Sequence, residues 1–309
     1  MIPENPEGRL APGCLRTLSP LDQVSAFCGL MEEEIAPAGP ASQNAALLRN
    51  YYRRLFGTKG KLIPVQVFGY GERLRPLLEA LSRRPSPARI LDAGSGYGTE
   101  SLLFALLGYD VVGVELVAER AALARARTPF FESKCSSPLR LDFVNANILS
   151  HLQKCEEVDV IWAMEAISHI FPPEDFFRLA FEKIEPGGVL AISDPNPMNI
   201  LAWWRSVRIR GSLVHRPHRK FHDPHTGSPV DYGQENLLTA NRLRRSLRLA
   251  GFSAVKIYFS GFMGSSLWPE PLLRASFAPP FLSRVQTMAR AMPGLNRLGT
   301  TYTLLASKS

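Results

Sequence analysis

The chain has 309 residues, of which 45% are hydrophobic, so it can bury a full core as one large or two small domains. Its net charge of +8 comes from basic residues scattered along much of the chain, which favours acidic surfaces or substrates without indicating nucleic-acid binding. No C-x-x-C pair, signal peptide or apolar run of about 18 residues is visible, so we expect a cytoplasmic protein, with peripheral membrane attachment left open.

The first part of the chain is predicted to be a leader followed by helices. Residues 1–18 contain three prolines and are expected to be flexible. Ser19 is a suitable helix cap, because proline and then an acidic residue follow it in the first turn. The expected helices span residues of about 20–35, 42–56 and 71–83.

A glycine-rich stretch follows an apolar run that ends in Asp92, and its alternate residues are Gly94, Gly96 and Gly98. The run predicts a buried parallel strand, and the glycines let the backbone turn sharply and lie close to a ligand. A helix over 101–107 and a strand over 109–114 complete a strand–turn–helix–strand unit. Glu115 then lies where the second strand ends, a position that in a doubly wound sheet can accept both hydroxyls of a ribose.

Thr99 distinguishes this stretch from the dinucleotide fingerprint G-x-G-x-x-G, which needs glycine at that position. The spacing G-x-G-x-G after a strand-end acidic residue resembles instead the class I S-adenosylmethionine (SAM)-dependent methyltransferases. Three further blocks follow in that family's order, and the resemblance is good over about residues 88–195. It implies an α/β enzyme with a doubly wound, mainly parallel, seven-stranded Rossmann-like sheet and an N-terminal helical lid.

The resemblance also implies a SAM site at the ends of the first strands. Asp92 would orient the amino group of SAM, the glycines would let the loop pass close to its methionine and ribose portions, and Glu115 would hold the ribose hydroxyls. The family commonly has an acidic residue at Asn147 that accepts a hydrogen bond from adenine, and asparagine can still accept that bond. The other expected SAM-binding residues are Ser95, Ile148 and Met164.

The strand predicted over 158–164 is followed by two candidate catalytic residues, Glu165 and His169. The resemblance places the end of this strand beside the methyl donor. His169 is interpreted either as a structural residue that fixes the turn or as the base that deprotonates the acceptor, a task that a neutral imidazole can perform near pH 7. Glu165 is the second candidate for that base.

The remaining elements complete the expected core. The helices are expected at 118–127, where Pro129 would end the helix, and at 174–184, 236–250 and 281–292, the last with an apolar stripe packed on the sheet. The further strands are expected at 139–145, 189–193, 253–259 and 302–306. The chain is thus divided into a leader and lid (1–87), a SAM-binding core (88–195), an inserted substrate segment (196–235) and the C-terminal part of the core (236–309).

The inserted segment carries the candidate acceptor residues. Between Leu201 and His222 it holds Trp203, Trp204, five arginines, one lysine and no acidic residue. This pattern fits a solvated basic helix packed on the core or a surface facing an acceptor or phospholipid. His215, His218, His222 and His225 could contribute to acceptor binding, form a polar loop or bind a metal, but the intervening prolines disfavour a preformed metal cage, so no metal is assigned.

The sequence therefore predicts a SAM-dependent methyltransferase of a small-molecule or lipid-like acceptor, with O-, N- or C-methylation left open. Tyr51 and Tyr52 are interpreted as core residues or as residues of the lid that line the site. A contact with an anionic membrane is left open, and no specific nucleic acid is expected. The alternatives are a non-catalytic, methyltransferase-like SAM-binding protein and an NAD-dependent oxidoreductase.

Overall fold

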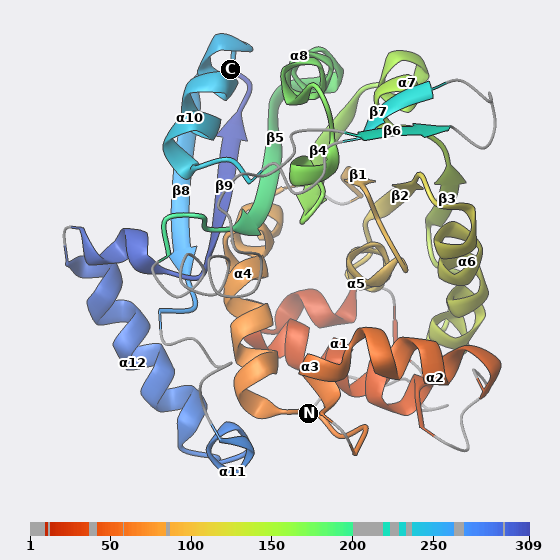
Figure 1. Ribbon diagram of the computed structural model, residues 1–309. Coiled ribbons are helices and arrows are strands. Elements are labelled where there is room, and N and C mark those ends of the chain that lie inside the picture. The colour runs from red at the N-terminus through yellow and green to blue at the C-terminus, as the bar shows by residue number, and fades with distance from the viewer. Residues whose placement is uncertain are drawn as a thin grey trace.

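A seven-stranded sheet forms the centre of the structure, a computed structural model shown in Figure 1. The strands run in the order β3-β2-β1-β4-β5-β9-β8, and a separate hairpin pairs β6 with β7. Their bounds are β1 (Arg89–Ala93), β2 (Asp110–Glu115), β3 (Leu141–Asn145), β4 (Val158–Met164), β5 (Ile184–Pro195), β6 (Arg219–His222), β7 (Pro229–Tyr232), β8 (Ala254–Ser260) and β9 (Thr301–Ser307). The structure describes residues 10–11, 13–36, 42–57, 59–84, 87–199, 219–222, 229–232, 237–262, 269–292 and 294–309.

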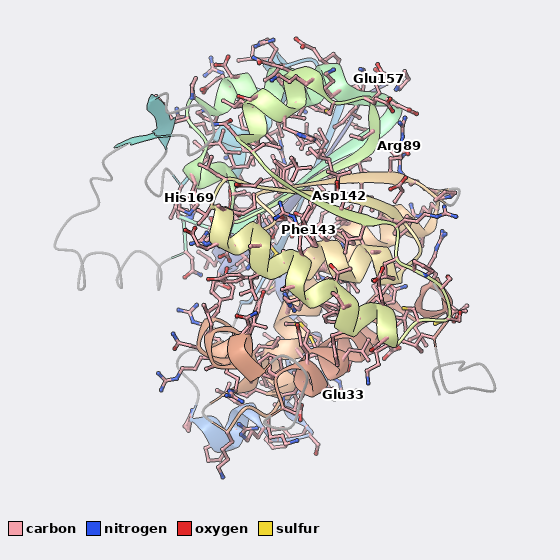
Figure 2. All side chains as sticks on the ribbon, turned by 90° about the vertical axis from the view of Figure 1, so that its right-hand side faces the viewer. Glu33, Arg89, Asp142, Phe143, Glu157 and His169 are labelled. Atoms are coloured by element: carbon pink, nitrogen blue, oxygen red, sulfur yellow. The ribbon has the colours of Figure 1, made fainter. Side chains whose placement is uncertain are left out.

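The first five strands are parallel, whereas β9 pairs antiparallel with both β5 and β8. Parallel strands present their carboxyl ends at one edge of a sheet, where ligands of open α/β folds bind. Figure 2 shows this polarity, with His169 at the carboxyl ends of the strands and Arg89 and Glu157 at their amino ends. The predicted doubly wound, mainly parallel sheet is thereby confirmed.

The central strands are buried on both faces, as is usual when helices cover both sides of a sheet. In β4, Val160 and Trp162 pack into one hydrophobic core, and Ile161 and Ala163 pack into the other. Because successive side chains of a strand point to opposite faces, one apolar run supplies both cores. The continuous apolar strands seen in the sequence therefore have a direct structural cause.

Helices cover both faces of the sheet (Figure 1). One face carries α7 (Ile148–Lys154), α8 (Pro173–Lys183) and α10 (Ala240–Leu249), and the other carries α4 (Pro64–Ser82), α5 (Thr99–Leu106) and α6 (Ala118–Ser133). The further helices are α1 (Pro20–Glu34), which packs against α4, and α2 (Ser42–Tyr51), α3 (Arg53–Phe56), α11 (Glu270–Leu273) and α12 (Ala278–Ala291). Among the described helices, none combines the length and apolar character needed to cross a membrane.

The prediction that Pro129 ends a helix over 118–127 was wrong, because α6 continues through it to Ser133. Proline removes one backbone hydrogen bond and crowds the preceding turn. The turn is held nevertheless by buried side chains on both sides of the proline, since Arg127 is 2% exposed and Phe131 is fully buried. The Phe131 ring stacks on Phe27 of α1, with 5.7 Å between the ring centroids. Tertiary packing thus outweighs the local preference.

Several other boundaries differ from the predicted ones. The helix predicted over 42–56 is interrupted at Tyr52, and the one predicted from residue 71 begins at Pro64, where proline occupies the first turn. The helix predicted from residue 236 begins after Thr239, whose hydroxyl oxygen accepts a hydrogen bond from the Arg242 amide at 3.2 Å. The strand predicted over 189–193 is longer, and α7 was not predicted.

The apolar stripe of α12 does not pack on the sheet as predicted. The helix packs against α4, and of its stripe only Leu282 is buried, at 8% exposure. Phe281, Met288 and Met292 are 46%, 65% and 49% exposed. A helical period shows that one face of a helix is apolar, but it does not show what covers that face.

Candidate active site

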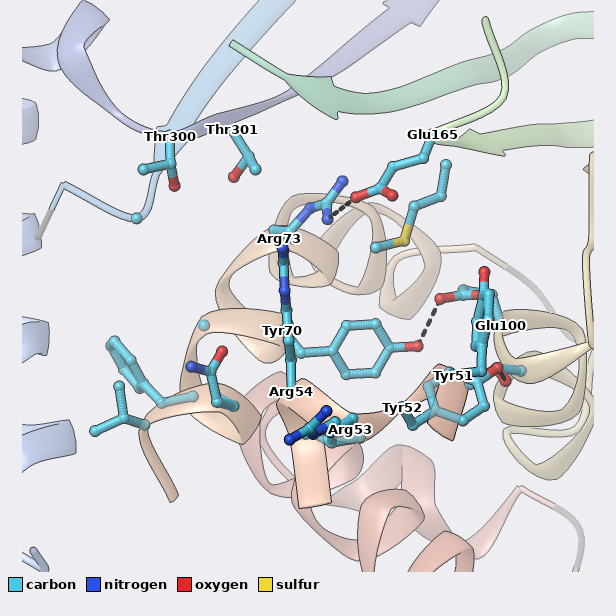
Figure 3. Close-up of a pocket in the computed structure, with 18 of the residues that line it drawn as sticks. Tyr51, Tyr52, Arg53, Arg54, Tyr70, Arg73, Glu100, Glu165, Thr300 and Thr301 are labelled. Carbon is cyan, nitrogen blue, oxygen red and sulfur yellow. Dashed lines mark hydrogen bonds and ion pairs between the residues drawn. The ribbon is translucent and has the colours of Figure 1, made fainter. Parts of the chain in front are cut away.

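A pocket of about 900 Å³ opens beside the glycine-rich loop that follows β1 (Figure 3). Its wall combines this loop, the end of β4, the start of α5, parts of α2 to α4, the inner face of α12 and the residues just before β9. The volume lies toward the upper end of the range of small-molecule sites, roughly 300–1,000 Å³. The residues predicted from the sequence that line it are Tyr51, Tyr52, Gly94, Ser95, Gly96, Met164 and Glu165.

The glycine-rich loop is held against β2 and β3 on one side, and its other side has room for a ligand at Gly96. The Gly94 and Ser95 amides both donate to the Val114 carbonyl of β2, at 2.8 and 3.0 Å. Gly98 has φ +75°, and a Cβ atom there would lie 2.5 Å from the Phe143 ring, so this position needs glycine for the loop to pack on β3. At Gly96 an added Cβ would meet no atom of the described residues within 4 Å, so this part of the backbone has room for a ligand.

Ser95 adds an unused polar group to the loop. Its hydroxyl oxygen is buried and has no hydrogen-bond partner among the described residues. Buried polar atoms are normally paired, so an unpaired one in a pocket wall suits a polar ligand. The loop therefore offers open backbone and one free hydroxyl side by side.

The Asp92 side chain is bonded to α5 and does not line the pocket. It is 2% exposed, and its Oδ2 accepts a hydrogen bond from the Ser101 hydroxyl at 2.6 Å. Burial, with a smaller contribution from the charge of Glu100, raises the pKa of Asp92 to about 8. The neutral form of Asp92 is thus favoured near neutral pH.

Glu115 lies directly beneath the glycine-rich loop, at the end of β2. Its Oε2 accepts from the Gly96 amide at 2.9 Å, and its Oε1 accepts from the Val117 amide at 2.8 Å. A carboxylate can accept about four hydrogen bonds, so acceptor capacity remains on both oxygens. The side chain is thus held next to the loop, although it does not line the described pocket.

Asn147 has a structural role that the sequence analysis did not include. It is the N-cap of α7, and its Oδ1 accepts from the Leu149 amide at 2.8 Å. Ile148 begins the same helix. Neither residue lines the described pocket, and the remaining lone pair of Oδ1 is the part of Asn147 still able to accept a further donor.

Glu165 enters the pocket wall with an unusual backbone. Its φ of +52° is in the left-handed region, which non-glycine residues seldom adopt and which is often associated with functional sites. Its Oε1 lies 2.7 Å from Arg73 Nη1, and Arg73 Nε donates to the Ser193 hydroxyl at 3.2 Å. The Arg73 charge lowers the pKa of Glu165, so the carboxylate is ionised at neutral pH.

Tyr70, Arg73 and Glu100 are pocket residues that the sequence analysis missed. The Tyr70 hydroxyl donates to Glu100 Oε1 at 2.7 Å, and burial raises the pKa of Glu100 (Figure 3). The only signal in the sequence was the position of Glu100, two residues after Gly98 and in the first turn of its helix. Tyr70 and Arg73 lie on α4, whose sequence shows nothing beyond an ordinary helical pattern.

A buried network fastens the N-terminal helices to the glycine-rich loop. Arg127 Nε and Nη2 lie 2.8 and 2.9 Å from the two carboxylate oxygens of Glu34, at the end of α1. Arg127 Nη1 donates to the Tyr97 carbonyl at 2.6 Å and to the Thr99 hydroxyl at 2.9 Å. The Thr99 hydroxyl also bonds the Tyr52 hydroxyl. One guanidinium therefore joins three segments that are far apart in sequence.

His169 is near the pocket but does not line its described wall. It ends the short 3-10 helix η2 (Ile167–His169), and its amide donates to the Ala166 carbonyl at 2.9 Å. Its charge contributes weakly to lowering the pKa of Glu165. The backbone contact would form with any residue type at this position, so both interpretations of His169 stay predictions.

Most candidate residues of the inserted segment lie outside the described residues. Trp203, Trp204, His215 and His218 lie outside the described residues, and so does His225. His222 is placed on the backbone of β6, but its side chain is not described. The roles predicted for these residues therefore stay predictions.

Comparison with known proteins identifies the family to which this chain belongs. A family model described as a methyltransferase domain matches residues 67–257. Erythromycin 3''-O-methyltransferase of Saccharopolyspora erythraea is 29% identical over 170 residues, which are 54% of this chain and 51% of that protein. Trans-aconitate 2-methyltransferase of Paracidovorax citrulli is 33% identical over 130 residues, 40% of this chain and 46% of that protein. The chain thus spans about half the length of these relatives.

Solved structures show the same fold at low sequence identity. A SAM-dependent methyltransferase from Archaeoglobus fulgidus is 14% identical with a TM-score of 0.52, over 84% of this chain and 99% of that one. One from Thermotoga maritima is 16% identical with a TM-score of 0.50, over 84% of this chain and 95% of that one. With the family match, the sheet order and the glycine-rich loop, the chain belongs to the class I SAM-dependent methyltransferases.

Proposed function

We propose that the protein transfers a methyl group from SAM to a small-molecule acceptor. The observation that carries this proposal is that one pocket of about 900 Å³ joins the glycine-rich loop to a second wall made by α2 to α4 and α12. SAM supplies an electrophilic methyl on its sulfonium, so the protein has mainly to align an acceptor and, where needed, remove its proton. A shared pocket supports such an alignment.

The donor-side roles are proposed for residues around the loop. The open backbone at Gly96 and the unpaired hydroxyl of Ser95 suit a polar ligand, and Glu115 is close enough to the loop to hold ribose hydroxyls. Glu100 offers a carboxylate whose burial favours a cationic partner, so we propose that it faces the ammonium group of SAM. Asp92 orients this end, and Asn147, Ile148 and Met164 are proposed around the adenine and sulfonium.

The decisive experiment uses methyl-labelled SAM, the intact protein and fractionated cell extract, followed by identification of the labelled product by mass. We expect labelled product and calorimetric SAM binding. SAM binding without transfer to any fraction would favour a non-catalytic SAM-binding protein. Saturable NAD binding without SAM binding would favour an oxidoreductase.

Glu115→Ala should weaken SAM binding by about 1 to 3 kcal/mol, because hydrogen bonds to a charged group are lost. Calorimetry measures the affinity, and thermal unfolding checks that the fold is retained. Glu119→Ala, which removes an exposed acid of α6, serves as the matched control and should bind like the parent. Unchanged affinity in Glu115→Ala would remove this residue from the site.

We also propose a peripheral contact with anionic membranes, carried by the outer face of α12 and the segment that follows it. Its large apolar residues are 41% to 65% exposed. Phe277, Phe281, Met288 and Met292 recur at helical spacing, and Leu295 begins the short 3-10 helix that follows. Arg284 lies between them, and no acidic residue follows Glu270 in the sequence. An apolar row with cations suits the boundary of an anionic bilayer.

The four cysteines are unpaired, which suits the reducing cytoplasm.

Phe281→Ser combined with Met288→Ser should reduce co-sedimentation with phosphatidylglycerol vesicles at least several-fold, because two exposed apolar anchors are removed. Leu249→Ser, which alters an 80% exposed leucine on α10, is the control and should sediment like the parent. Failure of the parent to bind such vesicles at low salt contradicts the proposal. If the parent is a dimer and the double variant is a monomer, the exposed face of α12 is instead a contact with a second copy of the chain.

A further inference from the structure

Two arginines of α3 line the pocket without a pairing partner. Arg53 and Arg54 belong to its wall, while Phe56 of the same short helix is fully buried and anchors it. Within the described ranges, neither guanidinium has a hydrogen bond or an ion pair. In Figure 3, Arg53 lies below Tyr70, and the Arg54 side chain extends upward past Tyr70 toward Arg73. The helix is thus fixed by its apolar end and presents two charges to the pocket.

The third arginine of the wall is already neutralised. Arg73 is ion-paired with Glu165 at 2.7 Å, and its side chain is only 14% exposed. The other described acid of the wall, Glu100, accepts the Tyr70 hydroxyl, and its burial disfavours the charged form. The charge of Arg54 also helps to lower the pKa of Glu165, but this single carboxylate faces both Arg73 and Arg54, so the described wall keeps an excess of positive charge.

The methyl donor does not balance this charge either. SAM carries a sulfonium, an ammonium and one carboxylate, so as a whole it is a cation. Two cations of a pocket wall that faces a net cationic ligand are best explained by a second, anionic ligand. Arginine is also well suited to this task, since its planar fork binds carboxylate and phosphate oxygens in pairs.

We propose that Arg53 and Arg54 form an anion subsite that binds a carboxylate or phosphate group of the methyl acceptor. The inference rests on the proposed methyl transfer and narrows its acceptor to molecules with such a group. The same chemistry has one other source, the carboxylate of SAM itself. The two sources predict different losses when the arginines are removed.

The test compares the parent with Arg53→Gln/Arg54→Gln and with a charge-matched control, Arg242→Gln/Arg245→Gln, which alters two exposed arginines of α10. Protein saturated with S-adenosylhomocysteine is titrated with citrate and with inorganic phosphate by calorimetry. We expect saturable binding of at least one anion by parent and control, weakened roughly 10- to 100-fold in the α3 variant, as loss of charged hydrogen bonds implies. No saturable binding by the parent, or equal binding by all three, overturns the subsite.

SAM affinity, measured on the same three proteins, separates the two sources. It should change less than about threefold in the α3 variant, and a loss above tenfold would assign the arginines to the SAM carboxylate and overturn the proposal. If the parent binds no SAM, the proposed function is wrong. Titration of the protein without S-adenosylhomocysteine with the same anions then still tests whether Arg53 and Arg54 bind an anion. Retention of the labelled methylation product on an anion exchanger at neutral pH supports the subsite, and a neutral product contradicts it.

Discussion

Replacing Arg127 with Met should lower the free energy of unfolding by about 3 to 5 kcal/mol, because it leaves the Glu34 carboxylate buried and unpaired. Both side chains are at most 1% exposed, so water cannot take over the lost contacts. The same change removes the donors to the Tyr97 carbonyl and the Thr99 hydroxyl, and SAM affinity should therefore also fall. Urea unfolding followed by circular dichroism measures the first effect, and calorimetry measures the second.

Two further variants show whether burial is the cause. Lys134→Met breaks the ion pair with Glu33. The Lys134 and Glu33 side chains are 34% and 57% exposed, so the free energy of unfolding should fall by less than about 1 kcal/mol. Arg127→Met combined with Glu34→Leu removes both buried charges and should be more stable than Arg127→Met alone. A loss below about 1 kcal/mol in Arg127→Met would show that the network contributes little to stability.

Glu165→Gln should lower turnover by about 10²- to 10⁴-fold with little change in SAM affinity, if Glu165 removes the proton of the acceptor. We expect a larger loss than from His169→Ala, because Glu165 lines the pocket as an ionised carboxylate and His169 does not line its described wall. A larger loss in His169→Ala would restore His169 as the base. The measurement is turnover with the acceptor found in the labelling experiment.

Acceptor analogues of graded acidity distinguish a base from a positioning role. An analogue already deprotonated at the assay pH needs no base, so the loss should shrink for it. If the loss of turnover in Glu165→Gln is the same for all analogues, Glu165 acts through its ion pair with Arg73, 2.7 Å away. Lower thermal stability in His169→Ala would support the turn-fixing interpretation of that residue.

The sequence predicted well what is decided locally. Asp92, the glycine-rich loop and Glu115 lie within 24 residues, and the structure brings the loop and Glu115 together as expected. Gly98 was visible in the sequence because only glycine fits there: its backbone conformation and the nearby Phe143 ring leave no room for a side chain. The sheet followed from the order of such local units.

The sequence predicted poorly what depends on distant partners. Helix α6 passes Pro129 because it packs on α1, about a hundred residues earlier in the chain. Arg73 was missed because its partner Glu165 lies 92 residues away, and neither position shows a pattern without the other. The glycine-rich loop beside the pocket was therefore predictable, whereas the opposite wall, built from α2 to α4 and α12, was predicted only at Tyr51 and Tyr52.

The order of strands in the sheet also constrains how the chain can fold. Among the described strands, β8 pairs with β9 alone, and β9 must first pair with β5, which precedes it by more than a hundred residues. Closing such long loops is slow, so the parallel strands can assemble before these two are added. Until β9 arrives, β5 is an open edge whose backbone groups can pair with another chain. Aggregation during refolding is therefore expected to begin at β5.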